Sequence, residues 1–317
     1  MKFHPDMINE LTERITSETL KYPCSVVIGD NSSGKSFLIK KLVELWMGKR
    51  SVYFIDAVNR GFNASKVTAV KEKLTYHNSR VVETRLKEDY FNLQDSFNFY
   101  GTSTERIEQI YSAFEERVQQ LFYELTGERF EIIFGDPLGE VQFGEAKGTL
   151  SSGYQAIIRI LLELLYYDGS IKQNTQTPKP YIVIDEIDEF LSPRYAAKLP
   201  VFLRNHFSQM EFVMTTHSID LVVAVCDANV IILDQNDFEV KDANDCNSYS
   251  EVQMIFQRVF GNEEAEIVSD IEKELRRLLN HKMNHIWSED DEARMEYLES
   301  TQLSASQQLI YRQIKEW

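Results

Sequence analysis

The run of residues from Gly29 to Ser36 constrains this chain more than any other feature of its sequence. It matches the pattern G-x-x-x-x-G-K-[ST], in which glycines permit a tight turn whose N–H groups point at phosphate oxygens. An apolar run, Cys24–Ile28, precedes it and predicts a buried strand. Apolar residues at helical spacing follow it as far as Gly48 and predict a helix. The sequence therefore predicts a phosphate site at a helix N-terminus, where free N–H groups and the helix dipole favour an anion.

The residues of this loop are predicted to bind a nucleotide. We expect Lys35 to reach the β- and γ-phosphates and the hydroxyl of Ser36 to bind Mg²⁺. The alternative is a glycine- and serine-rich turn that merely precedes Lys-Ser, and the flanking strand and helix argue against it. The predicted nucleotide-binding residues of the loop are Gly29, Asp30, Asn31, Ser32, Ser33, Gly34, Lys35, Ser36 and Phe37.

Composition narrows the class of protein. The chain has 317 residues, of which 43% are hydrophobic and 26% charged, as is usual for a globular protein. No apolar run approaches the roughly 18–20 residues that span a bilayer, and the N-terminus lacks a signal pattern. Three widely spaced cysteines (Cys24, Cys226 and Cys246) predict free thiols rather than a disulfide framework or a metal site. We therefore expect a cytoplasmic protein without a membrane partner.

The net charge of −16 bears on partners. It argues against a surface that coats DNA, because non-specific binding to nucleic acid requires Lys and Arg to displace counterions. A local basic groove stays compatible with this charge, and a basic protein partner is favoured by it.

The remaining patterns predict an α/β fold with a mostly parallel sheet flanked by helices. After a short helix within residues 1–24 and the phosphate-loop strand, we expect strands at 51–56, 181–184, 212–214 and 230–233. We assign residues 1–262 to the nucleotide-binding domain and 263–317 to a C-terminal helical extension. The acidic run Glu289, Asp290, Asp291 and Glu292 is interpreted as a solvated turn.

Residues 65–170 are predicted to form a helical lobe within the first domain. A capping box at Thr102–Glu105 starts a helix that continues to Leu125, and a hairpin signal lies between 130–134 and 141–143. A strongly apolar helix is expected from 156 to 167. The aromatic-rich segment at 90–100 is interpreted as packed lobe in preference to a stacking platform for bases.

Four motifs occur along the chain in a fixed order. The phosphate loop comes first, then Leu150–Gly153, then a strand that ends in Asp185-Glu186, and last a strand that ends at His217. Each motif is weak evidence alone, and the four in this order are strong evidence. The sequence resembles the ABC-type ATPases over most of residues 20–235. Within them it is similar to the soluble branch that includes the SMC, RecF and OLD-like proteins.

The resemblance implies a shared catalytic site. In that family two nucleotide-binding domains face each other head to tail and sandwich two ATP molecules. By position, Asp185 and Ser36 would hold Mg²⁺, Glu186 would be the general base, and His217 would lie near the γ-phosphate beside Lys35. The signature loop, Ser151, Ser152 and Gly153, would contact the ATP of the partner. Hydrolysis of ATP would then weaken the dimer.

Departures from the family pattern bear on the branch. After Glu186, the residues Leu191 and Pro193 match the OLD-like form, whereas Ile187 and Ser192 do not. This pattern speaks against a transporter subunit. The N-terminal strands that normally stack on adenine are missing or very short. For the glutamine loop, Gln94 is the nearest candidate by order and Gln142 a poorer one.

Four functions remain in competition. The leading one is a slow ATPase that acts as a switch on a partner effector, such as a nuclease or toxin, in bacterial phage defence. The second is a DNA-repair or chromosome-maintenance ATPase that binds nucleic acid directly. A transporter subunit would need a membrane partner. An ATP-binding protein without turnover conflicts with the intact catalytic residues. The second function would use a basic patch formed by Arg60, Lys71, Lys73, Arg80 and Arg85.

Overall fold

The structure is a computed structural model in which the chain forms two compact units, Met1–Met254 and Ile255–Trp317. Each unit is described by itself. The predicted domain boundary after residue 262 stays a prediction. The residues described are 4–47, 51–68, 74–87, 95–98, 107–134, 139–144, 146–172, 179–234, 237–246, 248–260, 271, 274–275, 277–279, 281–282, 287–299, 303 and 305–316.

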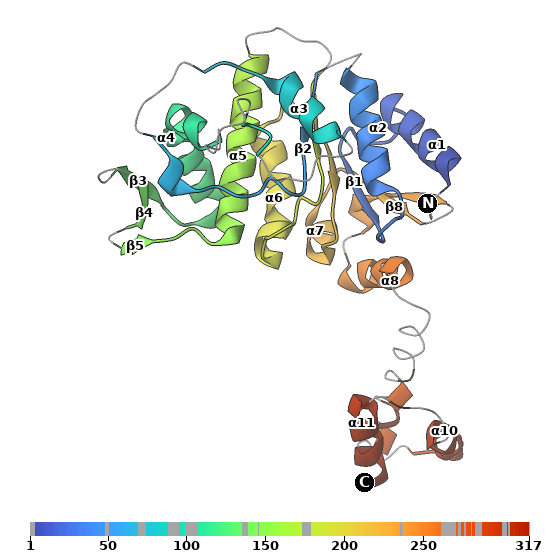
Figure 1. Ribbon diagram of the computed structural model, residues 1–317. Coiled ribbons are helices and arrows are strands. Elements are labelled where there is room, and N and C mark those ends of the chain that lie inside the picture. Colours follow the sequence, from blue (N-terminus) through green and yellow to red (C-terminus); the bar gives the residue numbers. More distant parts are fainter. Residues whose placement is uncertain are drawn as a thin grey trace. The chain divides into compact units, whose positions relative to one another are not determined.

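A six-stranded sheet forms the centre of the first unit (Figure 1). Its strand order is β2-β6-β7-β1-β8-β9, and every neighbouring pair is parallel except β8 and β9. This confirms the predicted α/β fold with a mostly parallel sheet. The edge strand β9 is the one strand of this sheet that the sequence patterns did not indicate. The strands are β1 (Ser25–Gly29), β2 (Val52–Ile55), β6 (Tyr181–Ile184), β7 (Glu211–Thr215), β8 (Asn229–Leu233) and β9 (Phe238–Asp242).

The strand order explains where a ligand site can form. Strands β1, β2, β6 and β8 are buried along their whole length, which is why they are continuous apolar runs in the sequence. Strand β7 lies between β1 and β6 and pairs in parallel with both. The carboxyl ends of these three strands are therefore adjacent, and ligands of open α/β sheets bind at such ends.

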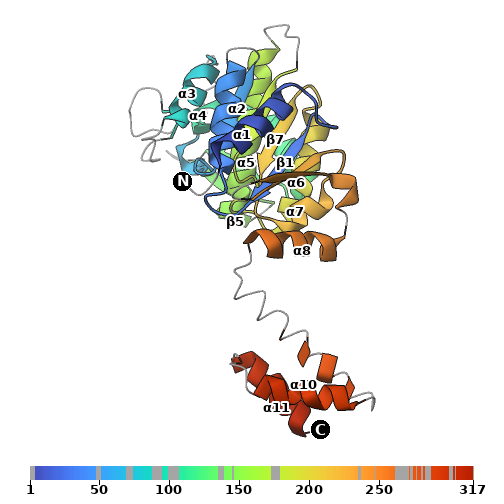
Figure 2. The same ribbon diagram turned by 90° about the vertical axis from the view of Figure 1, so that its right-hand side faces the viewer.

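Helices α1 and α2 lie side by side next to β1 (Figure 2). The side chain of Trp46 on α2 stacks on Tyr181 of β6 with ring centroids 4.0 Å apart, which anchors the helix after the phosphate loop to the sheet. A helix, and no strand, precedes β1 in the described residues, as the sequence predicts. The helices outside the lobe are α1 (Pro5–Thr16), α2 (Lys35–Met47), α6 (Pro193–His206), α7 (Ile219–Ala224), α8 (Tyr249–Phe260) and the 3-10 helix η2 (Ala243–Asp245).

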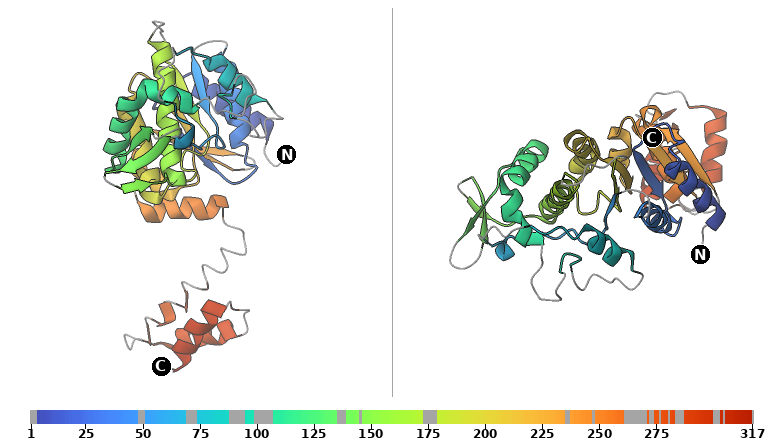
Figure 3. Two further views of the ribbon diagram at one scale, coloured as in Figure 1. Left: turned by 60° about the vertical axis from the view of Figure 1, so that its left-hand side comes forward. Right: turned by 90° about the horizontal axis from the view of Figure 1, so that it is seen from above.

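The lobe lies at the end of the first unit that is away from β8 and β9 (Figures 1 and 3). Helices α4 and α5 pack along each other beside a small antiparallel sheet, which confirms the predicted hairpin and adds one strand, β5. The predicted capping box and Gln94 lie outside the described residues. The elements of the lobe are η1 (Ala64–Lys66), α3 (Asn78–Leu86), α4 (Ile107–Thr126), β3 (Glu131–Phe134), β4 (Gly139–Phe143), β5 (Ala146–Gly148) and α5 (Ser152–Ile171).

The predicted basic patch is wrong in two of its members. Arg60 and Arg85 are only 2% and 3% exposed, and nearby buried carboxylates stabilise the charge of each guanidinium group. Arg85 pairs with Glu163 at 2.8 Å. Lys71 and Lys73 lie outside the described residues. In the aromatic-rich segment Phe97 is buried, as a packed lobe requires.

The second unit contains a small apolar core. Leu275, Leu278, Met295, Leu298 and Ile314 are buried against one another, with helices α10 (Glu289–Glu299) and α11 (Ala305–Glu316) supplying three of them.

The interpretation of residues 289–292 as a solvated turn is wrong, because α10 begins there. Asp291 is 1% exposed, and its backbone N–H donates to Ser288 Oγ while its carboxylate accepts from the Ser288 N–H at 2.9 Å. This reciprocal pair is a capping box, which turns an acidic run into a helix start.

Two further expectations bear on the described residues. The three cysteines are free thiols. In this part of the chain, no helix combines the length and apolar character that crossing a membrane requires.

Candidate functional site

The phosphate-binding loop joins β1 to α2 and closes around Lys35. The ammonium group of Lys35 donates to the carbonyl oxygens of Gly29, at 2.6 Å, and Asp30, at 3.1 Å. Gly34 has a φ of +105°, a conformation that residues with a side chain rarely adopt. A Cβ at Gly29 would lie 2.5 Å from Ser33 Oγ. Both glycines of the motif are therefore required by the shape of the loop.

The side chain of Ser33 indicates that the loop is built for a ligand. It is 1% exposed, and among the described residues its Oγ has no hydrogen-bond partner. A buried polar atom without a partner calls for an explanation, such as a group that binds there. Burial lowers the pKa of Lys35, which makes a negatively charged ligand beside it favourable. The loop therefore fits a nucleotide phosphate.

Asp185 and Glu186 follow β6, next to the strand that carries Thr215. The hydroxyl of Thr215 donates to Asp185 Oδ1 at 2.7 Å and accepts from the backbone N–H of Glu186 at 2.7 Å. The N–H of Asp185 donates to Ile55 O at 2.9 Å, which ties the pair to β2 as well. Two neighbouring strands thus fix the position of these carboxylates.

His217 follows β7 and faces Glu186. Its Nε2 atom lies 3.6 Å from Glu186 Oε1. Its backbone N–H lies 3.4 Å from both carboxylate oxygens of Asp188. The structure therefore brings together the histidine and the carboxylate that the sequence placed at the ends of separate strands.

The two adjacent carboxyl groups have pKa values moved in opposite directions. A hydrogen bond with His217 lowers the pKa of Glu186, and His217, Lys35 and Arg60 add favourable charge while burial opposes the shift. Burial raises the pKa of Asp185, and the hydrogen bond from Thr215 only partly offsets it. Two acids whose pKa values are shifted in opposite directions within one site can take different chemical roles.

Asp185 and Ser36 supply the kinds of oxygen atom that a divalent cation binds. A buried carboxyl with a raised pKa gains stability as a carboxylate when a cation binds to it. Lys35 and Asp185 are close enough for each to influence the pKa of the other. Oxygen ligands from a carboxylate and from a hydroxyl, here Ser36, are those that Mg²⁺ prefers. Phe37 follows Ser36 and is 41% exposed.

The signature loop stands at the start of α5. Ser151 is the N-cap of that helix, and its Oγ accepts from the N–H of Tyr154 at 3.2 Å. Ser151 and Ser152 are exposed. A Cβ at Gly153 would come within 3.0 Å of the carbonyl oxygen of Phe190, in the turn that follows Glu186. The signature loop therefore packs against the turn that follows Asp185 and Glu186, and its two serines are exposed.

Sequence reasoning missed two residues that hold the site. Thr215 binds both carboxylate residues, and Asp188 faces the backbone of His217. Each stands two residues from a predicted site residue, which is the only local signal for them. Gln142 is not part of the site, since it lies on β4 and its side chain binds the carbonyl oxygen of Gly144.

The chain is similar in sequence to two curated relatives, both called Septu protein PtuA. The relative from Bacillus mycoides is 24% identical over 272 residues, which cover 70% of this chain and 38% of the relative. The relative from Bacillus thuringiensis is 31% identical over 119 residues, which cover 35% of this chain and 28% of the relative. The chain thus spans less than two fifths of the length of either relative. No protein-family model matches the chain.

Solved structures give weaker matches. The structure of CbiO1 from Clostridium perfringens, part of an ABC transporter complex, is 17% identical over 81% of this chain and 86% of that chain, with a TM-score of 0.35. The SMC head domain from Thermotoga maritima is 17% identical over 43% and 51%, with a TM-score of 0.30. At these scores the assignment of the fold depends on the strand order and the motifs of this chain. On those grounds, the chain has an α/β fold with a phosphate-binding loop at the end of β1, and it is similar in sequence to the Septu protein PtuA.

Proposed function

We propose that the chain is an ATP-hydrolysing switch that dimerises head to tail around ATP and Mg²⁺ and regulates a partner effector in bacterial phage defence. The observation that carries the proposal is the arrangement at the carboxyl ends of β1, β6 and β7. Lys35, Asp185, Glu186 and His217 follow three adjacent strands in the chain. Glu186 is influenced electrostatically by both Lys35 and His217.

Each of these groups has a proposed part in hydrolysis. The loop from Gly29 to Ser36 binds the phosphates, and Lys35 leaves its carbonyl partners to pair with them. Glu186 orients the attacking water and accepts its proton, while His217 fixes the position of the Glu186 carboxylate. Ser36 and Asp185 would hold Mg²⁺, which supplies neutralisation of the phosphate charge.

The dimer is proposed because each protomer carries parts of two sites. Ser151 and Ser152 are exposed at the N-terminus of α5, where an anion is favoured. The resemblance to the ABC-type ATPases assigns the signature loop to the ATP of a second copy, and ATP would stabilise the closed pair by binding to both copies.

The proposed role in phage defence is supported by the sequence similarity to the Septu protein PtuA and by the resemblance to OLD-like ATPases. The partner would be an effector such as a nuclease or toxin, and free thiols fit a reducing cytoplasm. The alternative of direct binding to nucleic acid loses support, because Arg60 and Arg85 are buried.

The experiment compares phosphate release from ATP by the wild-type chain and by Lys35→Ala, Glu186→Gln and Glu189→Gln. We expect Lys35→Ala to lose nucleotide binding. Glu186→Gln should bind ATP and lose at least about 100-fold in rate, as is typical when a general base is removed. Glu189→Gln, in the turn that follows Glu186, is the matched control and should keep the wild-type rate. Equal rates for Glu186→Gln and Glu189→Gln would contradict the proposal.

A second assay addresses the biological role. Cells that express the chain together with its neighbouring genes should resist infection by phage, and Lys35→Ala in the same set of genes should abolish that resistance. Resistance that survives Lys35→Ala would show that ATP binding is not the switch.

A further inference from the structure

Residues 56–63 connect β2 to η1, and we call them the β2 loop. This loop contacts the backbone of Asp185 and Glu186 at one end and, through Gln155, the signature loop at the other. Its first part is fixed by Asp56, whose Oδ1 accepts from the Asn59 N–H at 2.8 Å and whose Oδ2 accepts from Asn59 Nδ2 at 2.7 Å. These two hydrogen bonds fix the turn before Arg60. The side chain of Arg60 is 2% exposed and lies at the carboxyl end of β6.

Arg60 binds the backbone of the catalytic carboxylates. Its Nη2 donates to Asp185 O at 2.7 Å and lies 3.5 Å from Glu186 O. Its Nε and Nη1 atoms have no hydrogen-bond partner among the described residues. The carboxylates of Asp56, Glu163 and Asp185 stabilise the charge through space. A buried guanidinium that leaves two of its nitrogens unused is costly, which points to a requirement for the contact that it does make.

That contact supports a strained residue. Glu186 has a φ of +47°, in the left-handed region that a residue with a side chain enters only when its surroundings enforce it. The Thr215 hydroxyl holds the N–H of Glu186, and Arg60 holds the carbonyl oxygens on either side of its Cα. The two contacts together fix where the carboxylate of Glu186 points.

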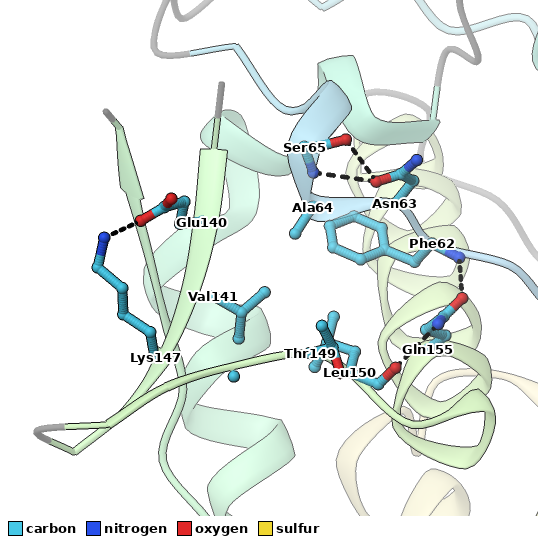
Figure 4. A pocket seen from close by; sticks show the side chains of 11 residues that line it. Phe62, Asn63, Ala64, Ser65, Glu140, Val141, Lys147, Thr149, Leu150 and Gln155 are labelled. Carbon is cyan, nitrogen blue, oxygen red and sulfur yellow. Dashed lines mark hydrogen bonds and ion pairs between the residues drawn. The ribbon is translucent and has the colours of Figure 1, made fainter. Parts of the chain in front are cut away.

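The other end of the β2 loop is tied to the signature loop (Figure 4). The N–H of Phe62 donates to Gln155 Oε1 at 3.4 Å, and Gln155 Nε2 donates to Leu150 O at 3.0 Å. Leu150 directly precedes Ser151. Gln155 thus bridges the β2 loop and the residue before the signature serine, at the wall of a cavity of about 550 Å³.

We propose that Arg60 and Gln155 are positioning residues that connect the signature loop to the catalytic base of the same protomer. Arg60 sets the backbone of Glu186, and Gln155 transmits the position of Leu150 to the β2 loop. When the signature loop binds the ATP of a second copy, it shifts Leu150. Gln155 passes this shift to the β2 loop, and Arg60 passes it to Glu186, the base that acts on the ATP of its own copy. This inference depends on the proposed function for its catalytic part, and its structural part stands on its own.

The structural part is tested by hydrogen exchange without nucleotide. In Arg60→Met, the amides of residues 185–190 should exchange about tenfold faster or more, as expected when a hydrogen bond from a charged donor is lost. Arg60→Lys keeps the charge and a donor, and should restore part of the protection. Tyr53→Phe is the matched control, since it removes one bond of 3.0 Å to Glu163 in the neighbouring buried network and leaves residues 185–190 untouched. Wild-type exchange at 185–190 in Arg60→Met would overturn the inference.

The catalytic part is tested by steady-state hydrolysis, in which kcat and KM are measured separately. Arg60→Met should lower kcat by about tenfold or more, with an unchanged affinity for ATP, since its contact positions the base and not the phosphates. A lower kcat with an unchanged KM marks a residue that positions the base and does not bind the phosphates. An unchanged kcat in Arg60→Met would contradict the catalytic part.

The link through Gln155 has a control on the same lobe. Gln155→Ala should lower kcat, whereas Gln142→Ala, which loses only a bond to Gly144 O, should leave it unchanged. Gln155→Ala also keeps the inference testable if Arg60→Met fails to fold. Wild-type kcat in Gln155→Ala would overturn the link. A wild-type chain that hydrolyses no ATP would defeat the proposed function, and the exchange data would still decide whether Arg60 holds Glu186.

Discussion

The molecule contains two clusters of charged side chains, one in the lobe and one at the phosphate-binding loop, and they are built differently. In the lobe, Glu163 accepts from Arg85 at 2.8 and 2.9 Å and from Arg159 at 2.6 Å, and all three are almost completely buried. At the loop, Lys35 is held by carbonyl oxygens, and Glu186 is about one third exposed and has a left-handed backbone.

The difference distinguishes a cluster that stabilises the fold from a cluster that can bind a ligand. Burial alone would lower the pKa of Arg85, but Glu163 and Asp56 raise it. The buried charges of the lobe cluster are therefore paired with one another. Paired buried charges of this kind hold a fold together and leave nothing for a ligand. Among the described residues, the Ser33 hydroxyl of the loop cluster has no hydrogen-bond partner, and Glu186 has a strained backbone, as is typical of functional sites.

The largest expected effect comes from breaking the lobe cluster. Glu163→Gln leaves Arg85 and Arg159 without their shared counter-charge in the interior, and should lower the free energy of unfolding by about 3–5 kcal/mol. Denaturation by urea, with the midpoint and slope both recorded, measures this loss. The control is Glu140→Gln, which breaks an exposed pair with Lys147 and should cost less than about 1 kcal/mol. Similar losses for the two variants would contradict the contrast between the clusters.

A smaller effect is expected when the loop cluster is changed at His217. The hydrogen bond with His217 is the main cause that lowers the pKa of Glu186, so His217→Ala should raise that pKa. Since Glu186 is proposed to act as the base, we expect hydrolysis above its pKa and a loss of hydrolysis as the pH falls through it. The acid limb of the rate profile should therefore move to higher pH in His217→Ala, while the unfolding midpoint stays near that of the wild type. An unmoved limb would remove His217 from the site.

The smallest expected effect concerns an acidic group that belongs to neither cluster. In the second unit, burial would raise the pKa of Asp291, but hydrogen bonds from His281 and Ser288 keep it below its usual range. Ser288→Ala removes the cap of α10 and should cost about 1 kcal/mol. Thermal unfolding followed by circular dichroism measures the change, with the exposed Ser208→Ala as a control. No change in Ser288→Ala would mean that the capping box contributes little to this helix.

The sequence predicted the sheet and indicated the candidate site residues because both depend on local patterns. Buried parallel strands are continuous apolar runs, and Lys35, Asp185 and His217 stand directly after or near the ends of such runs. The strand β9 has only half-buried residues and no comparable run, which is why it escaped prediction.

The burial of Arg60 and Arg85 could not be predicted from local patterns. Arg85 meets Glu163 78 residues further along the chain, and Arg60 meets Asp185 after 125 residues. An arginine is most often exposed, and only the folded structure shows that a buried carboxylate or carbonyl group is its partner. The capping box at Ser288 and Asp291 did carry a local signal, and the contiguous acids beside it obscured that signal.

The central claim is that two copies of the chain close around ATP through the phosphate loop of one and the signature loop of the other. The most direct test is the mass in solution of Glu186→Gln, with and without ATP and Mg²⁺, since this variant should bind ATP and not release it by hydrolysis. The account predicts a monomer that becomes a dimer with ATP, and a double variant with Ser151→Arg that stays a monomer. A Glu186→Gln protein that binds ATP and keeps the same mass would contradict the claim.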